Sequence, residues 1–219
     1  MKIVLACPVA NTPLVDIRMA AFCASLDRYQ NITWPWAQTP SPATGRNALI
    51  ECQLHDPEVT HLFFLDSDTV PPPDCIPRLL ALDKDVAAGM TPIIAGGSRH
   101  AWNVAIEGEQ WLGRQDPLPE GPFPVAHMGG TTLLIRRAVL EAVGYPWFKF
   151  DYQPMGSGVE LISRGEDVFF CDRVHECGFE IWVDPTIQCD HFKYVNLLTL
   201  TEDCVARVPM TPAAPSPAA

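Results

Sequence analysis

His61-Leu62-Phe63-Phe64-Leu65-Asp66-Ser67-Asp68 is the stretch of sequence that decides the fold. Its first part is a short, nearly continuous apolar run, which is typical of a β-strand buried on both faces. Its last part puts two carboxylates directly after that strand. Ligands of open α/β sheets bind beyond the carboxyl ends of the strands, so the sequence predicts a buried strand at 61–65 that ends at a binding edge.

Apolar runs and amphipathic segments alternate on both sides of this stretch. Working outward, we expect strands at 3–6, 31–36 and 85–90, and helices at 14–29, from 44 or 45 to 54, and after Pro71-Pro72-Pro73-Asp74. This β-α-β alternation predicts an α/β fold with a mostly parallel central sheet flanked by helices.

The second half of the chain is less regular. We expect a small antiparallel hairpin from strands at 101–106 and 110–112, a strand at 131–135, a helix at 136–143, a long loop at 144–164, a helix at 166–177, and short strands at 180–183 and 187–189. The hairpin would stand beside the parallel sheet.

Length and composition indicate one globular domain. The chain has 219 residues, of which 47% are hydrophobic and 19% charged, which is enough for one α/β core and tight for two. We expect this domain to span 1–207 and the Pro- and Ala-rich segment 208–219 to be a flexible tail. No apolar run reaches the ~18–20 residues that cross a bilayer, and segment 1–8 is too short for a signal peptide. We therefore expect a cytoplasmic protein without a membrane span.

The net charge of −11 and the cysteine pattern restrict the partners. An acidic chain does not attract nucleic acid by its overall field, so nucleic acid is a disfavoured partner, whereas a divalent cation suits the charge. None of the eight cysteines forms a CxxC pair. We therefore expect reduced core thiols rather than a zinc site.

Asp66 and Asp68 form the first candidate site. Residues i and i+2 of an extended chain point the same way, so both carboxylates can face one ligand. Paired carboxylates suit Mg²⁺ or Mn²⁺, which also bind diphosphate oxygens. The alternative interpretation is an Asp-rich turn that caps the next helix.

Glu166, Asp167 and His191 are candidate catalytic and metal-binding residues. The two acids open a predicted helix, where Asp167 could deprotonate an acceptor hydroxyl as a general base. The alternative is structural, because Ser163-x-x-Glu166 matches a capping box and acids in a first turn suit the helix dipole. His191 follows a short strand and either completes a metal shell begun by Asp68 or is an ordinary loop or core residue.

A glycine pair, one arginine and two tryptophans are further candidates. Gly129-Gly130 allows close backbone approach to a ligand or makes a plain tight turn. Arg46 opens a helix where it can reach a phosphate or a nucleobase, or it remains a surface charge. Trp102 and Trp147 can stack on a sugar or a base, or they fill the core.

In this order, the motifs resemble those of the GT-A glycosyltransferases, specifically the family 2-like group with its short stand-alone members in bacteria and bacteriophages. The matching segments are Ala6-Cys7-Pro8-Val9, Arg46-Asn47, 62–68, Met128-Gly129-Gly130-Thr131, 165–171, 178–181, Asp184-Pro185 and His191. The resemblance spans nearly the whole chain to about His191. A DxD string alone is a weak signal, whereas the ordered set of DxD, GG, ED and a late His is specific.

The resemblance implies a GT-A fold and a metal-dependent transfer of a sugar from a nucleotide-diphosphate sugar to a hydroxyl acceptor. It implies that Asp68 and His191 bind Mn²⁺ or Mg²⁺, and that Asp66 contacts the ribose or bridges to the metal. Asp167, which follows Glu166 in the ED motif, would be the general base of an inverting reaction.

The resemblance also implies residues around the donor. Pro8, Val9 and Ala10, together with Arg46 and Ser67, would lie near the nucleotide. Gly129-Gly130 would border the donor sugar and the acceptor. One departure from the family is the absence of the acidic residue that usually follows the first-strand proline, where this chain continues with Val9, Ala10 and Asn11.

Other functions are open at this point. A sugar-phosphate nucleotidyltransferase uses a related sheet but usually has a Gly-rich loop after the first strand, and segment 7–13 contains no glycine. A non-catalytic nucleotide-sugar-binding module is the second alternative, against which the intact set of Asp66, Asp68, Asp167 and His191 argues. The acceptor can be a glycan, a lipid, a protein or a modified nucleobase, the last being disfavoured by the acidic charge.

Overall fold

The structure is a computed structural model that describes residues 1–9, 16–26, 32–33, 35–39, 41–95, 99–108, 110–155 and 159–193. Several predicted features lie outside these residues. They are the tail at 208–219, Ala10 and Asn11, the end of the first expected helix at Tyr29, and Cys204. Within the described residues, no helix is long and apolar enough to cross a membrane. The seven described cysteines are all free thiols.

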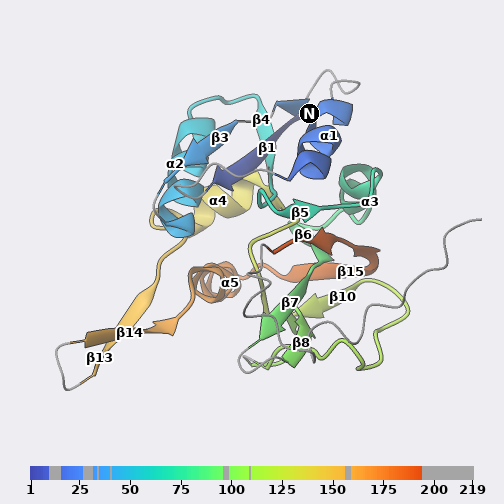
Figure 1. The fold of residues 1–219 in the computed structure, drawn as a ribbon. Helices are drawn as coiled ribbons and strands as arrows, with labels where there is room; N and C mark the ends of the chain where they lie inside the picture. The colour runs from blue at the N-terminus through green and yellow to red at the C-terminus, as the bar shows by residue number, and fades with distance from the viewer. Residues whose placement is uncertain are drawn as a thin grey trace, which may run out of the picture.

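An eight-stranded sheet forms the centre of the molecule (Figure 1). Its strand order is β10 (Phe123–Val125), β15 (Ile181–Gln188), β6 (Val86–Met90), β12 (Leu133–Arg136), β4 (Val59–Phe64), β1 (Lys2–Val9) and β2 (Ile32–Thr33), with β3 (Trp36–Gln38) also paired to β1. All strands run in one direction except β10 and β12, which run antiparallel to their neighbours. The predicted mostly parallel sheet is confirmed.

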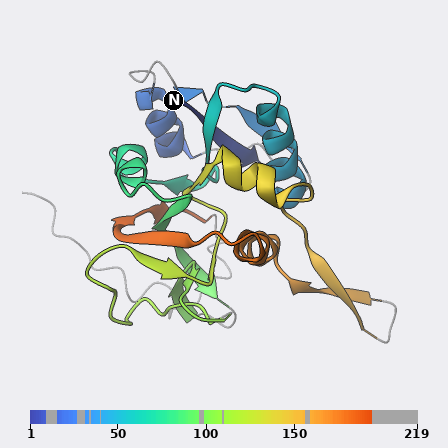
Figure 2. The same cartoon turned by 180° about the vertical axis from the view of Figure 1, so that it is seen from behind.

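Each face of the sheet carries its own hydrophobic core, which explains the apolar runs in the sequence. In β4, Leu62 and Phe64 point into one core, whereas Phe63 points into the other. Helices α2 (Pro42–Leu54), α4 (Arg137–Val143) and α5 (Glu166–Glu176) cover the first face, and α1 (Ile17–Ser25) and α3 (Cys75–Ala81) cover the second (Figures 1 and 2). A strand covered on both sides has no polar face, so its sequence does not alternate.

The expected hairpin between 101–106 and 110–112 is wrong in its pairing. Strand β8 (Arg99–Trp102) pairs with β7 (Pro92–Ala95), and β9 (Val104–Ala105) pairs with β11 (His127–Met128). Asn103 separates β8 from β9, because its side-chain Oδ1 accepts from the backbone N–H of Thr91 at 2.7 Å. Leu112 makes backbone hydrogen bonds with Trp102 and Val104, and Gly113 forms an isolated bridge with Ala101, so this segment pairs with the region without forming a strand.

The long loop expected at 144–164 is also corrected. Its second half is an antiparallel hairpin of β13 (Asp151–Met155) and β14 (Val159–Arg164), which projects from the body in both views (Figures 1 and 2). Conversely, the two strands expected at 180–183 and 187–189 are the single strand β15, whose register shifts between Val183 and Gln188. Pro185 lies in this shift, where its missing N–H breaks the ladder.

Candidate functional site

The DxD triplet lies directly beyond the end of β4, and it lines a pocket. Leu65 is fully buried, and Asp66, Ser67 and Asp68 then leave the sheet. The pocket measures about 210 Å³, and its lining residues are Pro8, Val9, Thr39, Pro42, Asp66, Ser67, Asp68 and Lys193. Five of the residues that the sequence assigned to donor or metal binding therefore meet in one concave site.

Arg46 occupies the centre of a buried charge cluster behind this pocket. It lies on α2 and is only 2% exposed. Its Nη2 donates to Asp66 Oδ1 at 3.0 Å, and its Nη1 donates to Glu166 Oε1 at 2.9 Å. Asp167 Oδ1 lies 3.4 Å from the same Nη1. Arg46 is therefore not a solvated surface charge, which was the alternative interpretation of the sequence. Its guanidinium links the end of β4 to the start of α5.

Three carboxylates around one guanidinium leave an excess of negative charge in a region poor in water. Burial raises the pKa of Glu166 to about 7, Asp167 adds to this rise, and Arg46 opposes it. Burial also raises the pKa of Asp167, against the attraction of Arg46. Burial alone would lower the pKa of Arg46, but the carboxylates outweigh it and hold that pKa above its ordinary value. The cluster therefore favours keeping a proton among its acids.

Asp167 is partly exposed at the edge of this cluster. Its Oδ1 is buried and lies 3.4 Å from Arg46 Nη1, whereas the side chain as a whole is 27% exposed. A partly exposed carboxylate that is positioned by a neighbouring guanidinium can accept a proton from a bound molecule.

Gly130 makes the approach of these charges to the backbone possible. A Cβ at this position would lie 2.6 Å from Asp167 Oδ1 and 2.8 Å from Arg46 Cζ. At Gly129 a Cβ would lie 3.2 Å from the Cβ of Asn103. The two glycines thus allow the backbone to pack closely against the charge cluster and Asn103. A tight turn alone would not require both of them.

Asp68 has a different set of partners. Strand β16 (Asp190–His191) pairs with β5 (Thr69–Val70) and brings His191 Nε2 to 3.4 Å from Asp68 Oδ1. Lys193 Nζ donates to Asp68 Oδ2 at 2.6 Å. Burial would raise the pKa of Asp68, but the hydrogen bonds from His191 and Lys193 outweigh it and lower that pKa to about 2.

Asp68 and His191 together fit a divalent cation whose remaining ligands are water or phosphate oxygens. Among the described residues there is no group of three or more His, Cys, Asp or Glu side chains that could hold a metal ion. His191 Nδ1 lies 2.7 Å from the carbonyl of Pro92, and since a carbonyl only accepts, Nδ1 must carry the proton and Nε2 is the atom that faces Asp68. This second-sphere contact is typical of metal-binding histidines. One carboxylate and one imidazole suffice when water and phosphate complete the shell.

Two structural interpretations of the sequence are resolved by these contacts. The capping box is wrong, because Ser163 belongs to β14, the N-cap of α5 is Gly165, and no side chain caps the helix. Glu166 turns to Arg46 instead. The two tryptophans belong to the core, since Trp102 is 4% exposed and Trp147 is 6% exposed.

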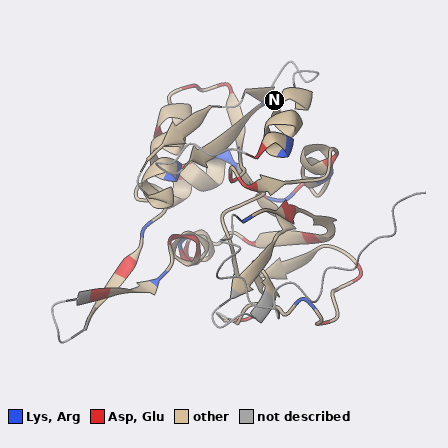
Figure 3. Cartoon of the chain, in the orientation of Figure 1, with Lys and Arg blue, Asp and Glu red and all other residues tan. Residues whose placement is uncertain are grey.

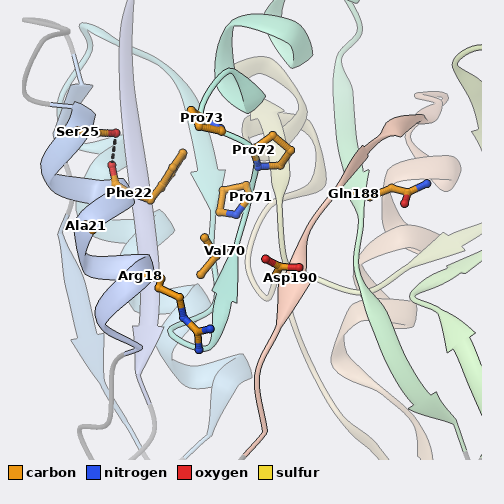
Figure 4. A pocket seen from close by; sticks show the side chains of 10 residues that line it. All are labelled: Arg18, Ala21, Phe22, Ser25, Val70, Pro71, Pro72, Pro73, Gln188 and Asp190. Carbon is orange, nitrogen blue, oxygen red and sulfur yellow. Dashed lines mark hydrogen bonds between the residues drawn. The ribbon is translucent and has the colours of Figure 1, made fainter. Parts of the chain in front are cut away.

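A second, larger pocket of about 540 Å³ lies between α1 and the strands β5 and β16 (Figure 4). Its wall includes Pro71-Pro72-Pro73, with Arg18 and Asp190 near one end. None of the residues predicted for catalysis, donor binding or metal binding lines it. The smaller pocket at the end of β4 is therefore the better candidate site, because it contains the carboxylates.

Sequence reasoning missed Lys193 and the pocket residues Thr39 and Pro42. Lys193 could have been predicted, because residues i and i+2 of an extended chain point the same way and Lys193 lies two residues after His191. Thr39 and Pro42 carried no chemical signal. Ala10, which was expected near the nucleotide, lies outside the described residues.

Comparison with known proteins shows the fold alone. The sequence matches no protein-family model and no curated protein. Among solved structures, A197 from STIV has a TM-score of 0.63 at 19% identity, covering 89% of this chain and 87% of that chain. GalNAc-T7, crystallised with UDP, GalNAc and Mn²⁺, has a TM-score of 0.53 at 11% identity; the match covers 90% of this chain but only 44% of that chain. The GT-A fold expected from the sequence is confirmed.

Proposed function

We propose that this protein is a metal-dependent glycosyltransferase that moves a sugar from a nucleotide-diphosphate sugar to a hydroxyl acceptor with inversion. The observation that carries the proposal is the division of the DxD triplet between two partners. Asp68 meets His191, and Asp66 connects through Arg46 to Asp167. A candidate metal-binding pair and a candidate base thus flank the end of one strand. The presence of UDP, GalNAc and Mn²⁺ in GalNAc-T7, which shares the fold, supports this choice.

On the donor side, the pocket beside Pro8, Val9 and Ser67 would hold the nucleoside diphosphate. Asp68 and His191 would hold Mn²⁺ or Mg²⁺, which when bound neutralises the charge that develops on the leaving diphosphate. The end of the first strand and the triplet form one wall, so the nucleotide would lie across the carboxyl end of the sheet, where α/β folds bind such ligands.

On the acceptor side, Asp167 would take the proton of the attacking hydroxyl. The acceptor O–H bond breaks as its oxygen bonds to the anomeric carbon, and the bond from that carbon to the diphosphate oxygen breaks. Asp167 Oδ2 receives the proton, while Arg46 orients the carboxylate. Glu166 is buried against Arg46 and would tune the cluster rather than contact the acceptor.

A binding screen followed by turnover tests the proposal. The protein is heated with a panel of nucleotide sugars, with and without Mn²⁺, and we expect one donor to raise Tm only when Mn²⁺ is present, because ligands of the native state stabilise it. With that donor, Asp167→Asn should still bind but lose about 10²–10⁴-fold in donor turnover. Unchanged turnover in this variant would remove Asp167 from the mechanism. Binding without any donor cleavage by the wild type would favour a non-catalytic module.

A further inference from the structure

Lys193 is the one cationic side chain that lines the candidate donor pocket among the described residues. Its Nζ donates to Asp68 Oδ2, and its side chain is 56% exposed while that of Asp68 is 27% exposed. Lys193 therefore contacts the Asp68 carboxylate from the solvent side. The proposed divalent cation would bind this same carboxylate.

The backbone beside Lys193 is fixed, although its side chain is exposed. The N–H of Phe192 donates to the carbonyl of Asp68 at 2.9 Å, and the Phe192 ring lies under the guanidinium of Arg18 at 3.3 Å. The pairing of β16 with β5 holds the preceding residues. The ammonium group thus sits on a flexible four-carbon stem whose root stays next to the pocket.

The ion pair is of the kind that a ligand can exchange. Exposed lysine–carboxylate pairs contribute little free energy, because water solvates both charges. A divalent cation at Asp68 would repel the ammonium group, whereas the diphosphate of a donor would attract it. Lysine suits phosphate as a mobile point charge with three donors.

We propose that Lys193 alternates between two partners: it neutralises Asp68 in the metal-free protein, and it binds the diphosphate of the donor once Asp68 has taken a divalent cation. This inference rests on the proposed function, because it uses the same metal pair and the same donor class. It makes Lys193 a competitor of the metal alone and a ligand of the metal–nucleotide complex. A residue with a purely structural role would not act in opposite directions on these two equilibria.

Calorimetric titrations separate the two roles. Mn²⁺ alone is titrated into chelator-treated wild type and Lys193→Gln, and then UDP and GDP are titrated at saturating Mn²⁺. We expect Lys193→Gln to bind Mn²⁺ about fivefold more tightly, since a weak competitor is removed. The same variant should bind the preferred nucleotide about tenfold more weakly, since a charge-assisted hydrogen bond is lost. Lys193→Arg keeps the cation and should restore nucleotide affinity.

Lys149 provides the matched control. Its side chain is 55% exposed and pairs with Asp151 at 2.9 Å, away from the pocket. Lys149→Gln should leave both affinities at their wild-type values. If wild type binds Mn²⁺ and Lys193→Gln binds it equally or more weakly, or binds nucleotide equally well, the role of Lys193 is refuted while the proposed function stands. If neither protein binds Mn²⁺, the metal site of the proposed function fails as well.

Discussion

Asp66 and Asp68 follow the same strand two residues apart and are 32% and 27% exposed, yet their cationic partners differ in burial. The partner of Asp66 is Arg46, whose side chain is 3% exposed, whereas Asp68 pairs with Lys193, whose side chain is 56% exposed. Breaking a buried ion pair typically costs about 3–5 kcal/mol, and an exposed pair contributes about 0–1 kcal/mol. Asp66 therefore belongs to a permanent electrostatic frame, formed by Arg46 and the carboxylates around it. Asp68, in contrast, can exchange its partner.

This difference separates two tasks at one strand end. The Arg46 cluster links α2, β4 and α5, so it fixes the position of Asp167 relative to the sheet. Asp68 instead pairs with a lysine that is exposed to solvent, although both aspartates line the pocket.

Arg46→Met should cost about 3–5 kcal/mol of the free energy of unfolding, because it leaves buried carboxylates without their cation. Urea unfolding measured by circular dichroism gives this value. Arg173 is the control: it lies on α5, its side chain is 39% exposed, it pairs with Glu176, and it donates to the carbonyl of Val143 at 2.9 Å. Arg173→Met should cost about 1–2 kcal/mol, because it removes an exposed ion pair and one hydrogen bond. Equal losses for the two variants would abolish the distinction between the buried and the exposed pairs.

Gly130→Ala should cost about 2 kcal/mol, because the added Cβ would overlap Asp167 Oδ1 and the buried guanidinium of Arg46. Donor turnover should fall with stability, since the same overlap moves the carboxylate of Asp167. Gly121→Ala is the control, because a Cβ there meets nothing within 4 Å. The result that contradicts the close packing is a Gly130→Ala protein as stable as Gly121→Ala.

The pH dependence of stability should reveal the buried acids. The folded-state pKa of Glu166, about 7, lies above its ordinary value of 4.5, so the folded protein binds this proton more tightly than the unfolded chain. The stabilisation is fully present below pH 4.5 and is lost as pH rises toward 7, in total about 1–3 kcal/mol. Asp68 and Asp16, whose pKa values are lowered to about 2, act in the opposite direction but below this window.

Glu166→Gln isolates that contribution. Glutamine keeps an oxygen for Arg46 but has no proton to bind, so its stability should fall less between pH 5 and 7 than that of the wild type. His191, whose pKa is also raised, adds a slope of the same sign in both proteins. The difference between the two urea-unfolding series is therefore the measurement. Parallel stability curves would mean that Glu166 neither takes up nor releases a proton between pH 5 and 7.

The sequence predicted the strands of the central sheet better than the partners of the two aspartates. The strands at 3–6, 61–65 and 85–90 were predictable because burial on both faces leaves an uninterrupted apolar run. The β13–β14 hairpin was not, since it projects from the core and its Pro and Gly residues are typical of loops. Asp68 and His191 were predicted to bind one metal ion, and the structure brings Asp68 Oδ1 and His191 Nε2 to 3.4 Å from each other. The burial of Arg46 was not predictable, because its partner Glu166 is 120 residues away.

Asp68→Asn should change stability least and metal binding most. The exposed pair with Lys193 contributes about 0–1 kcal/mol, and asparagine keeps the size of the side chain and one acceptor oxygen, so the urea midpoint should stay close to that of the wild type. Mn²⁺ affinity, measured by calorimetry without nucleotide, should fall at least tenfold, because a neutral amide replaces the only carboxylate that faces His191 Nε2 among the described residues. A variant that unfolds as readily as Arg46→Met would show that Asp68 belongs to the permanent frame. A variant that binds Mn²⁺ as the wild type does would move the metal to the Asp66 side, where Arg46 already occupies one carboxylate oxygen.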